Sequence, residues 1–232
     1  STDNTIDVTA TANNITMVGG TVYDATSGNV TATAAGNVAI GEITTSGNVT
    51  VTATGGTISD AATDAAADIS GNIADLTAGT GIGGAAADAD IDTTVTTVRA
   101  DVTGTGAIYI DETNGVALGD GTSGISTNDG LIDITAGGAI TTGNTIASGT
   151  NGNIDIATTA DGITLSNGVT ANGSGAVTLD AAGLLTVNAA VSSTSGAIDA
   201  TGGTGVTHNA AGDLSTDNTI DVTATANNIT MV

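Results

Sequence analysis

Residues 215–232 read STDNTIDVTATANNITMV, which repeats residues 1–18 letter for letter. The chain of 232 residues therefore returns to its own beginning after 214 positions, and chance does not produce a match of this length. Internal repeats decide the architecture of a chain. We expect residues 1–214 to be one unit of a tandem array and residues 215–232 to begin the next identical unit.

A finer repeat lies inside this unit. At each step a Gly or Asn is followed two positions later by a β-branched residue that begins an alternating apolar pattern, as in the sequence GNVTVTA of residues 47–53. Successive side chains of a strand point to opposite faces, so the alternation predicts a half-buried strand. Nine such opening strands occur in the unit, and a tenth repeats the first. They begin near Ile6, Val30, Val49, Ile73, Ile108, Ile132, Ile154, Val177, Ile198 and Ile220.

Two more apolar positions follow each opening strand. The second lies eight or nine residues after the first, and the third is looser in its spacing. The second positions are Ile15, Val38, Ile58, Ile82, Val116, Ile140, Ile163, Leu185 and Val206. The third positions are Val22, Ile43, Ile69, Ile125, Ile146, Val169, Val191 and Leu214. Three short strands per step describe one turn of a β-solenoid, so the sequence predicts an all-β, single-stranded parallel β-helix with about nine coils in each unit.

The composition agrees with a solenoid. Gly contributes 35 residues, Pro and Cys are absent, and Tyr23 and Tyr109 are the only aromatic residues. A globular domain of this length normally fills a wide core with aromatic side chains. A solenoid is instead a narrow tube in which each coil covers only its neighbours. Gly and Asn suit its corners, because both tolerate left-handed backbone.

One coil departs from the regular spacing of the opening strands. The fourth and fifth opening strands begin 35 residues apart, and the surplus falls in an irregular excursion at residues 83–105, which contains Arg99, the only Lys or Arg of the chain. An extra strand, a protruding flap and two irregular sides are all compatible with its pattern. Two Ala/Asp-rich runs, residues 61–68 and 85–90, have the most helical composition, and for both we favour a polar bulge at a corner over a helix.

The charge and the motifs exclude several classes of function. The 24 acidic residues against one Arg give a formal net charge of −23, so neither nucleic acid nor an anionic membrane surface is an expected partner. No apolar run approaches the roughly eighteen residues of a membrane-spanning helix. Neither a P-loop, a GxSxG or HExxH motif, nor a Cys/His cluster occurs, so we expect no enzyme. The Thr-, Asn- and Gly-rich composition without Lys favours an extracellular protein.

The repeating units carry a resemblance. The sequences of residues 47–53 and 130–136, each followed by a second short strand, resemble the repeats of filamentous haemagglutinin-like exoproteins, which are large bacterial surface adhesins of the two-partner-secretion type. The resemblance covers all nine coils except the excursion. It implies a right-handed parallel β-helix that forms the shaft of an extracellular filament, with further copies of the unit end to end and a role in cell adhesion and biofilm attachment.

A candidate metal site follows from the solvent-facing positions. In each opening strand, the residue between the two inward positions faces outward. From coil to coil it reads Asp7, Thr31, Thr50, Ala74, Tyr109, Asp133, Asp155, Thr178, Asp199 and Asp221. Neighbouring strands lie about 4.8 Å apart, so stacked carboxylates repel each other unless solvent screens them or a cation lies between them. Calcium prefers such oxygen ligands. The sequence therefore predicts either a solvated acidic face or calcium at Asp133, Asp155, Asp199, Asp221 and Asp7, which could also bridge two shafts laterally.

His208 is the only histidine. It lies two residues after Val206, in the inward register of the second strands, so we expect it in the core between Val187 and Met231. A core histidine with a single hydrogen bond is the favoured interpretation, and a pH sensor or ligand is the alternative.

Two functions remain open at this stage. The first is the structural shaft of a filament. The second is a glycan- or ice-binding surface, because Thr31 and Thr33 lie on one predicted coil and Thr50 and Thr52 on the next. A lattice-matching array must persist over many coils, and Asp, Ala and Tyr interrupt this one, so the shaft is favoured.

Overall fold

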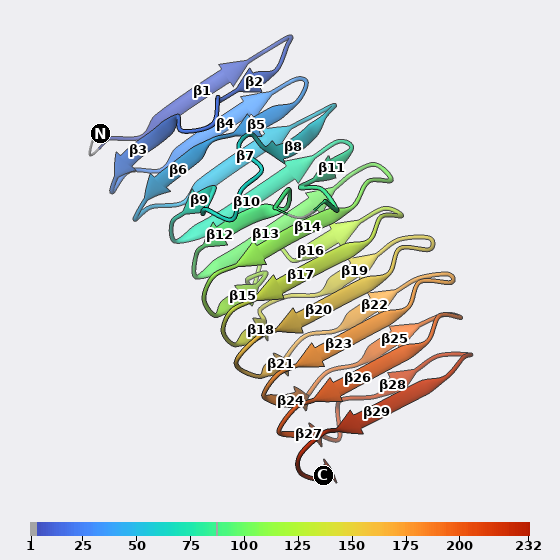
Figure 1. Ribbon diagram of the computed structural model, residues 1–232. Helices are drawn as coiled ribbons and strands as arrows, with labels where there is room; N and C mark the ends of the chain where they lie inside the picture. Colours follow the sequence, from blue (N-terminus) through green and yellow to red (C-terminus); the bar gives the residue numbers. More distant parts are fainter. Residues whose placement is uncertain (1–3, 87) are drawn as a thin grey trace.

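The computed structural model describes residues 4–86 and 88–232, and in these residues it contains thirty strands and no helix. The chain winds along one axis from its N-terminal to its C-terminal end (Figure 1). Strands of successive coils pair in parallel, as β1 with β4 and β17 with β20. The predicted parallel β-solenoid is therefore confirmed.

The opening strands begin where the alternating pattern predicted them. They are β1 (Ile6–Ala10), β4 (Val30–Ala34), β7 (Val49–Ala53), β10 (Ile73–Ala78), β14 (Ile108–Glu112), β17 (Ile132–Ala136), β20 (Ile154–Thr158), β23 (Val177–Ala181), β26 (Ile198–Gly202) and β29 (Ile220–Ala224). One more strand of similar length, β13 (Thr97–Val102), lies inside the excursion.

The shorter strands fall into two columns. The second strands are β2 (Ile15–Thr16), β5 (Val38–Ile40), β8 (Thr57–Asp60), β11 (Gly81–Ile82), β15 (Val116–Leu118), β18 (Ile140–Thr142), β21 (Ile163–Leu165), β24 (Leu184–Val187), β27 (Gly205–His208) and β30 (Ile229–Met231). The third strands are β3 (Val22–Thr26), β6 (Glu42–Thr45), β9 (Ile69–Ser70), β12 (Ile91–Thr94), β16 (Ile125–Thr127), β19 (Ile146–Ser148), β22 (Val169–Ala171), β25 (Val191–Ser193) and β28 (Leu214–Ser215).

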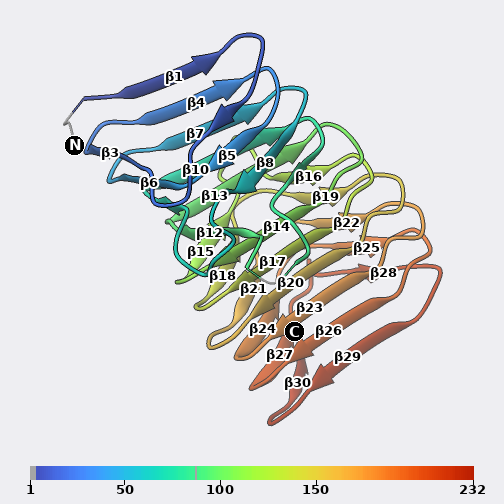
Figure 2. The ribbon, with the colours of Figure 1, turned by 45° about the horizontal axis from the view of Figure 1, so that its top comes forward.

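Two sheets face each other across the core (Figure 2). The first sheet has 16 strands: β1, β4, β7 and β10 stack on one another and end on β13. There the sheet divides, because β13 pairs with β15 through Thr97 and Val98 and with β16 through residues 100–102. The second sheet has 14 strands, and in it two columns of short strands join into one column of long strands. Its two columns of short strands meet on β14, where Ile108 pairs with Ile82 of β11 and Ile110 with Ile91 of β12.

The excursion is therefore an extra half-turn of the solenoid. Of the three arrangements that its sequence allows, the structure has the extra strand, β13. Opening strands lie in the first sheet before this point and in the second sheet after it. From β1 to β28 the chain makes ten levels in the first sheet and nine in the second, so one unit comprises nine and a half coils rather than nine. In consequence β1 and β29, which have the same sequence, lie in opposite sheets.

The core is a set of apolar columns parallel to the axis. Burial alternates residue by residue along the opening strands, as in Ile132–Ala136, where every second side chain is buried. One column runs through Ile82, Ile108, Ile132, Ile154, Val177 and Ile198, all at most 1% exposed. Burying one such side chain contributes about 1.5–3 kcal/mol, so each coil is stabilised mainly by the coils directly above and below it.

Glycine is required at the corner before each of the five opening strands β14, β17, β20, β23 and β26. A Cβ atom on Gly152 would overlap the backbone carbonyl oxygen of Gly130, and one on Gly196 would overlap that of Gly175. At this corner the backbones of successive coils touch directly. The recurring Gly therefore sets how closely the coils can stack.

The structure corrects the predicted register of two strands. In β3 the expected apolar position, Val22, is 47% exposed and pairs with Glu42, whereas Tyr23 pairs with the buried Ile43.

The second correction concerns β10. Ala74 was expected to face solvent, but it is fully buried and pairs with Val49, while Ile73 is half-buried. The outward residue of β10 is Asp75, and Ala74 pairs on its other side with Val98 of β13 rather than stacking below Tyr109.

The two Ala/Asp-rich runs form bulges, as favoured. In residues 61–68 the backbone N–H groups of Ala62 and Asp64 donate to the carboxylate of Asp60 at 2.6 and 3.1 Å. Asp side chains thereby satisfy backbone donors that a helix would need, which is why such residues favour turns. In residues 85–90, Ala89 N–H donates to the Ala86 carbonyl at 3.1 Å, and Ala87 lies outside the described residues.

Candidate functional site

The predicted acidic pairs lie side by side on the second sheet. Asp133 of β17 pairs directly with Asp155 of β20, and Asp199 of β26 pairs with Asp221 of β29, with Thr178 of β23 between the two pairs. Burial raises the pKa of Asp133, and the nearby carboxylates of Asp155 and Asp90 raise it further. Asp133 and Asp155 are therefore adjacent, and their proximity opposes the ionisation of Asp133.

Asp7 does not join these residues. Its strand, β1, lies in the first sheet, where Asp7 pairs with Thr31, whereas its sequence copy Asp221 lies in the second sheet. The sequence could not reveal this separation, because the extra half-turn that causes it lies in the irregular excursion. Across residues 4–86 and 88–232, moreover, no three His, Cys, Asp or Glu side chains are grouped so as to hold a metal ion.

A second group of acids, which the sequence reasoning missed, lies inside the solenoid beside the 61–68 bulge. Asp60 is 8% exposed and Asp68 only 2%. Burial, and next the carboxylate of Asp60, raise the pKa of Asp68 to about 9, although a hydrogen bond from the backbone N–H of Asp92 opposes the shift. Asp68 is therefore protonated at neutral pH. A signal was available, because Asp60 lies two residues after the inward Ile58 and so in the inward register.

The acids continue outward along the second sheet. Burial, followed by the charges of Asp90 and Asp111, raises the pKa of Asp92 to about 7. Asp92 pairs with Asp111 of the next coil, whose own pKa is raised by burial and by Asp90. One oxygen of Asp92, Oδ2, is buried without a hydrogen-bond partner. In this part of the second sheet, burial and neighbouring carboxylates therefore oppose the ionisation of these carboxyl groups.

Glu112 ends this group in the core. It is fully buried, and it accepts hydrogen bonds from the Thr93 hydroxyl at 2.7 Å and from the backbone N–H groups of Val95 and Asn114, each at 3.1 Å. Burial raises its pKa although these donors oppose the shift. The side chain joins the ends of β12 and β14, so it holds the chain where the extra half-turn begins.

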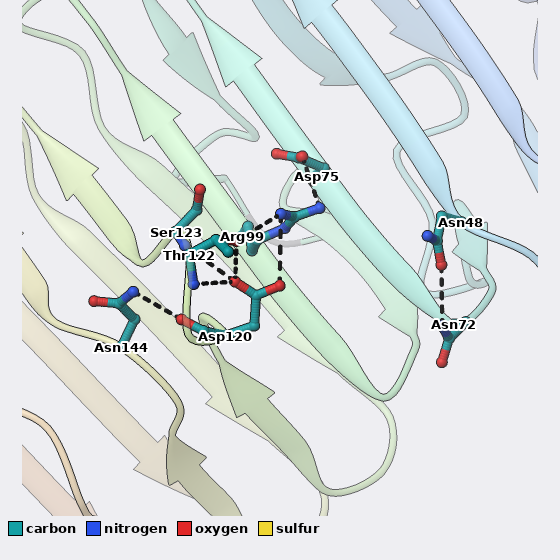
Figure 3. Close-up of polar contacts among 8 residues, drawn as sticks. All are labelled: Asn48, Asn72, Asp75, Arg99, Asp120, Thr122, Ser123 and Asn144. Atoms are coloured by element: carbon teal, nitrogen blue, oxygen red, sulfur yellow. Dashed lines mark hydrogen bonds and ion pairs between the residues drawn. The ribbon is translucent and has the colours of Figure 1, made fainter.

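Arg99 lies on the outer face of β13, where the first sheet divides (Figure 3). Its Nη2 is 2.9 Å from Asp75 Oδ2 of β10, and its Nη1 is 3.5 Å from Asp120 Oδ2 in the turn after β15. Hydrogen bonds from the Thr122 hydroxyl and from the N–H groups of Thr122 and Ser123 lower the pKa of Asp120 to about 2. Arg99 thus links three successive levels of the sheet at the transition.

Two pockets lie near these groups. One, of about 370 Å³, is lined by Asp88 and Asp90 of the excursion and by Tyr109 and Asp133 of the second sheet. The other, of about 350 Å³, is lined by Arg99 with acidic and hydroxyl side chains, including Asp101. The first offers only oxygen ligands suited to a hard cation. The second offers both donors and acceptors.

His208 has the predicted register. It pairs with Val187 on one side and Met231 on the other, and its Nε2 contacts the Gly212 carbonyl oxygen. It is half-buried rather than fully buried, because Met231 above it is itself 75% exposed.

Comparison with protein-family models, with curated proteins and with solved structures finds no match to this chain. Within the described residues, no helix has the length and apolarity needed to cross a membrane. The assignment of a function therefore depends on the geometry of the chain itself.

Proposed function

We propose that this chain is the structural shaft of a long, repetitive extracellular filament or adhesin, which supplies length and stiffness for attachment at a cell surface or in a biofilm. The observation that carries the proposal is the joint between units. Residues 215–232 begin the next copy of the sequence, and they continue the ladder of the preceding coil without a break.

The joint is in register on both sheets. Five residues of β29, from Ile220 to Ala224, pair with β26, and Ile229 to Met231 of β30 pair with β27. A further unit therefore needs no linker and no new interface. Because each coil is held by its neighbours, adding units extends one rod rather than joining separate domains.

The charge and the resemblance support the same function. A net charge of −23 favours the solubility of long acidic rods. The repeats resemble the shaft of filamentous haemagglutinin-like exoproteins rather than an adhesive tip. The proposal assigns the chain no catalytic step, and it places further copies of the same unit at both ends.

The length of the rod tests the proposal. Nine and a half coils at about 4.8 Å each advance about 46 Å. Proteins of one, two and three units, measured by small-angle X-ray scattering, should lengthen by that increment per unit at constant cross-section. A matched control carries a Gly/Ser linker between the units. If the uninterrupted chain is as flexible as this control, the shaft proposal fails. Immunogold labelling of intact source cells tests the location, and unlabelled cell surfaces would contradict it.

A second candidate function, binding of ice or glycans, rests on the threonine array of the first sheet. Thr31 pairs with Thr50 and Thr33 with Thr52, all pointing outward. Thr31 pairs below with Asp7, so charge bounds the array on that side. Growth inhibition of ice crystals, measured as thermal hysteresis, would favour this function over the shaft.

A further inference from the structure

The second half of the solenoid separates charge by face. On the second sheet, β17, β20, β23, β26 and β29 each carry one outward acidic residue. These are Asp133, Asp155, Asp180, Asp199 and Asp221. We call this the acidic face. On the first sheet, the strands from β15 to β28 in the described part of the chain carry no acidic residue.

The opposite surface is lined by hydroxyl, methyl and amide groups. Its second strands carry a ladder in which Ala117, Thr141, Thr164, Thr186 and Thr207 pair in sequence. Its third strands carry Ser126, Ala147, Thr170, Ser192 and Ser215 in the same way. We call the five levels from β15 and β16 to β27 and β28 the neutral face.

The turns between the two ladders are also nearly free of charge. In the three central levels they comprise residues 143–145, 166–168 and 188–190, none of which is charged. Asp120 in the turn after β15 is paired with Arg99, which leaves Asp213 as the exposed carboxylate at the far end of the face. Both ladders continue from the single strand β13, so they lie in one sheet.

We propose that the neutral face is a docking surface for a second copy of this chain, so that two solenoids lie side by side with their acidic faces turned outward. This inference goes beyond the shaft proposal, because it concerns the side of the rod and not its length. Two facing ladders with the same spacing of about 4.8 Å can interdigitate, as small side chains do between paired sheets in steric zippers.

Electrostatic repulsion favours docking through the neutral face over docking through the acidic face. Packed sheets lie about 10 Å apart, so in the proposed pair about 30 Å, or several Debye lengths of about 8 Å, separates the two acidic faces. Docking through the acidic faces would instead bring five carboxylates of each copy within about 10 Å of the other five. The chain has one Arg and no Lys to compensate them.

The area is sufficient for a pair. Five levels extend about 24 Å along the axis, and two three-residue strands with their turn cover about 25 Å across it, which gives about 600 Å² per copy. Both partners together bury about 1,200 Å², the lower bound for a specific interface. A surface that docks on its own copy gives a pair with twofold symmetry.

A charge placed on either face tests the proposal. Thr164→Glu adds a carboxylate to the neutral face, and Thr178→Glu is the matched control, because Thr178 is also an outward, half-buried strand residue but lies on the acidic face. We expect wild type to form pairs between micromolar and millimolar concentration in EDTA, with a doubled cross-section in X-ray scattering. Thr164→Glu should raise the dissociation constant at least about tenfold, and Thr178→Glu should leave it nearly unchanged. End-to-end association would double the length instead and would contradict the proposal.

Cross-linking gives a second measurement that does not need a charge. The chain contains no Cys, so Thr164→Cys and Thr178→Cys each introduce a single thiol. A short bis-maleimide should join pairs through position 164 and not through position 178. A monomeric wild type at all concentrations, or equal cross-linking at both positions, would overturn the proposal. Either result would leave the increment in rod length per unit unaffected.

Discussion

Replacing Asp68 by Asn should stabilise the solenoid at neutral and alkaline pH. The Asp68 carboxyl group is buried beside Asp60, and its pKa rises from 3.8 to about 9 on folding. Well below pH 3.8 the group is protonated in both the folded and the unfolded chain, so it does not affect their balance. As the pH rises, the unfolded chain releases this proton and the folded chain keeps it, so stability is lost progressively until the pH passes about 9.

The magnitude follows from the two pKa values. One pH unit between them corresponds to about 1.4 kcal/mol, so at pH 7 Asp68 disfavours folding by about 4 kcal/mol. Asn carries no charge at any pH and removes this term. Its amide oxygen can still accept the hydrogen bond that Asp92 N–H donates to Asp68 Oδ2 at 3.1 Å.

Urea unfolding of wild type and Asp68→Asn between pH 4 and pH 9 measures the effect. We expect the two proteins to have similar midpoints at pH 4 and to diverge steadily in favour of the variant. Asp180→Asn, at an exposed position of β23, serves as the control and should follow wild type. Parallel curves for wild type and Asp68→Asn over this range would refute the reasoning, because Asp68 would then ionise alike in both states.

Three further predictions concern the glycine corners, the ion pairs of Arg99 and the acidic face. Gly152→Ala should destabilise the rod by about 1–3 kcal/mol in urea unfolding, since the added methyl group meets a backbone carbonyl of the preceding coil. An unchanged urea midpoint would contradict this, because it would mean that the two coils can move apart at this corner without loss of stability. Arg99→Gln should lower Tm, and by less in high salt, because it leaves Asp120 uncompensated; a loss independent of salt would point to packing instead. Millimolar calcium should raise Tm by more than sodium at equal ionic strength, and replacing Asp133 and Asp155 by Asn should reduce that difference; identical effects of the two cations would leave a solvated acidic face.

The regular coils could be predicted because the sequence of each coil contains its own alternating pattern of apolar and polar residues. In β17 and β20 the inward and outward residues alternate without exception, so strand, register and the contact between Asp133 and Asp155 all follow from the sequence. In β10 two alternating sets compete. Ile73 begins one set and Leu76 belongs to the other, and the structure buries Leu76. A single large residue therefore misled the assignment of Ala74.

The exchange of sheets could not be predicted from side chains. Both sheets are parallel and both bury one apolar face, so an opening strand is equally suited to either. β1 and β29 demonstrate this, because the same residues fold in the first sheet at one end and in the second at the other. The buried Asp68 was hidden for a different reason, since it precedes Ile69 at the end of an irregular bulge where alternation gives no register.

The half coil left over in each unit determines the symmetry of a filament built from it. Each unit is turned by half a revolution relative to the one before, so an array advances as a twofold screw of about 46 Å per step and returns to the same orientation after about 91 Å. Such a filament has a direction along its axis but no front and back, because every surface feature recurs alternately on both sides. Along each side of the array, the neutral face of one unit would therefore alternate with the acidic face of the next, at intervals of about 46 Å.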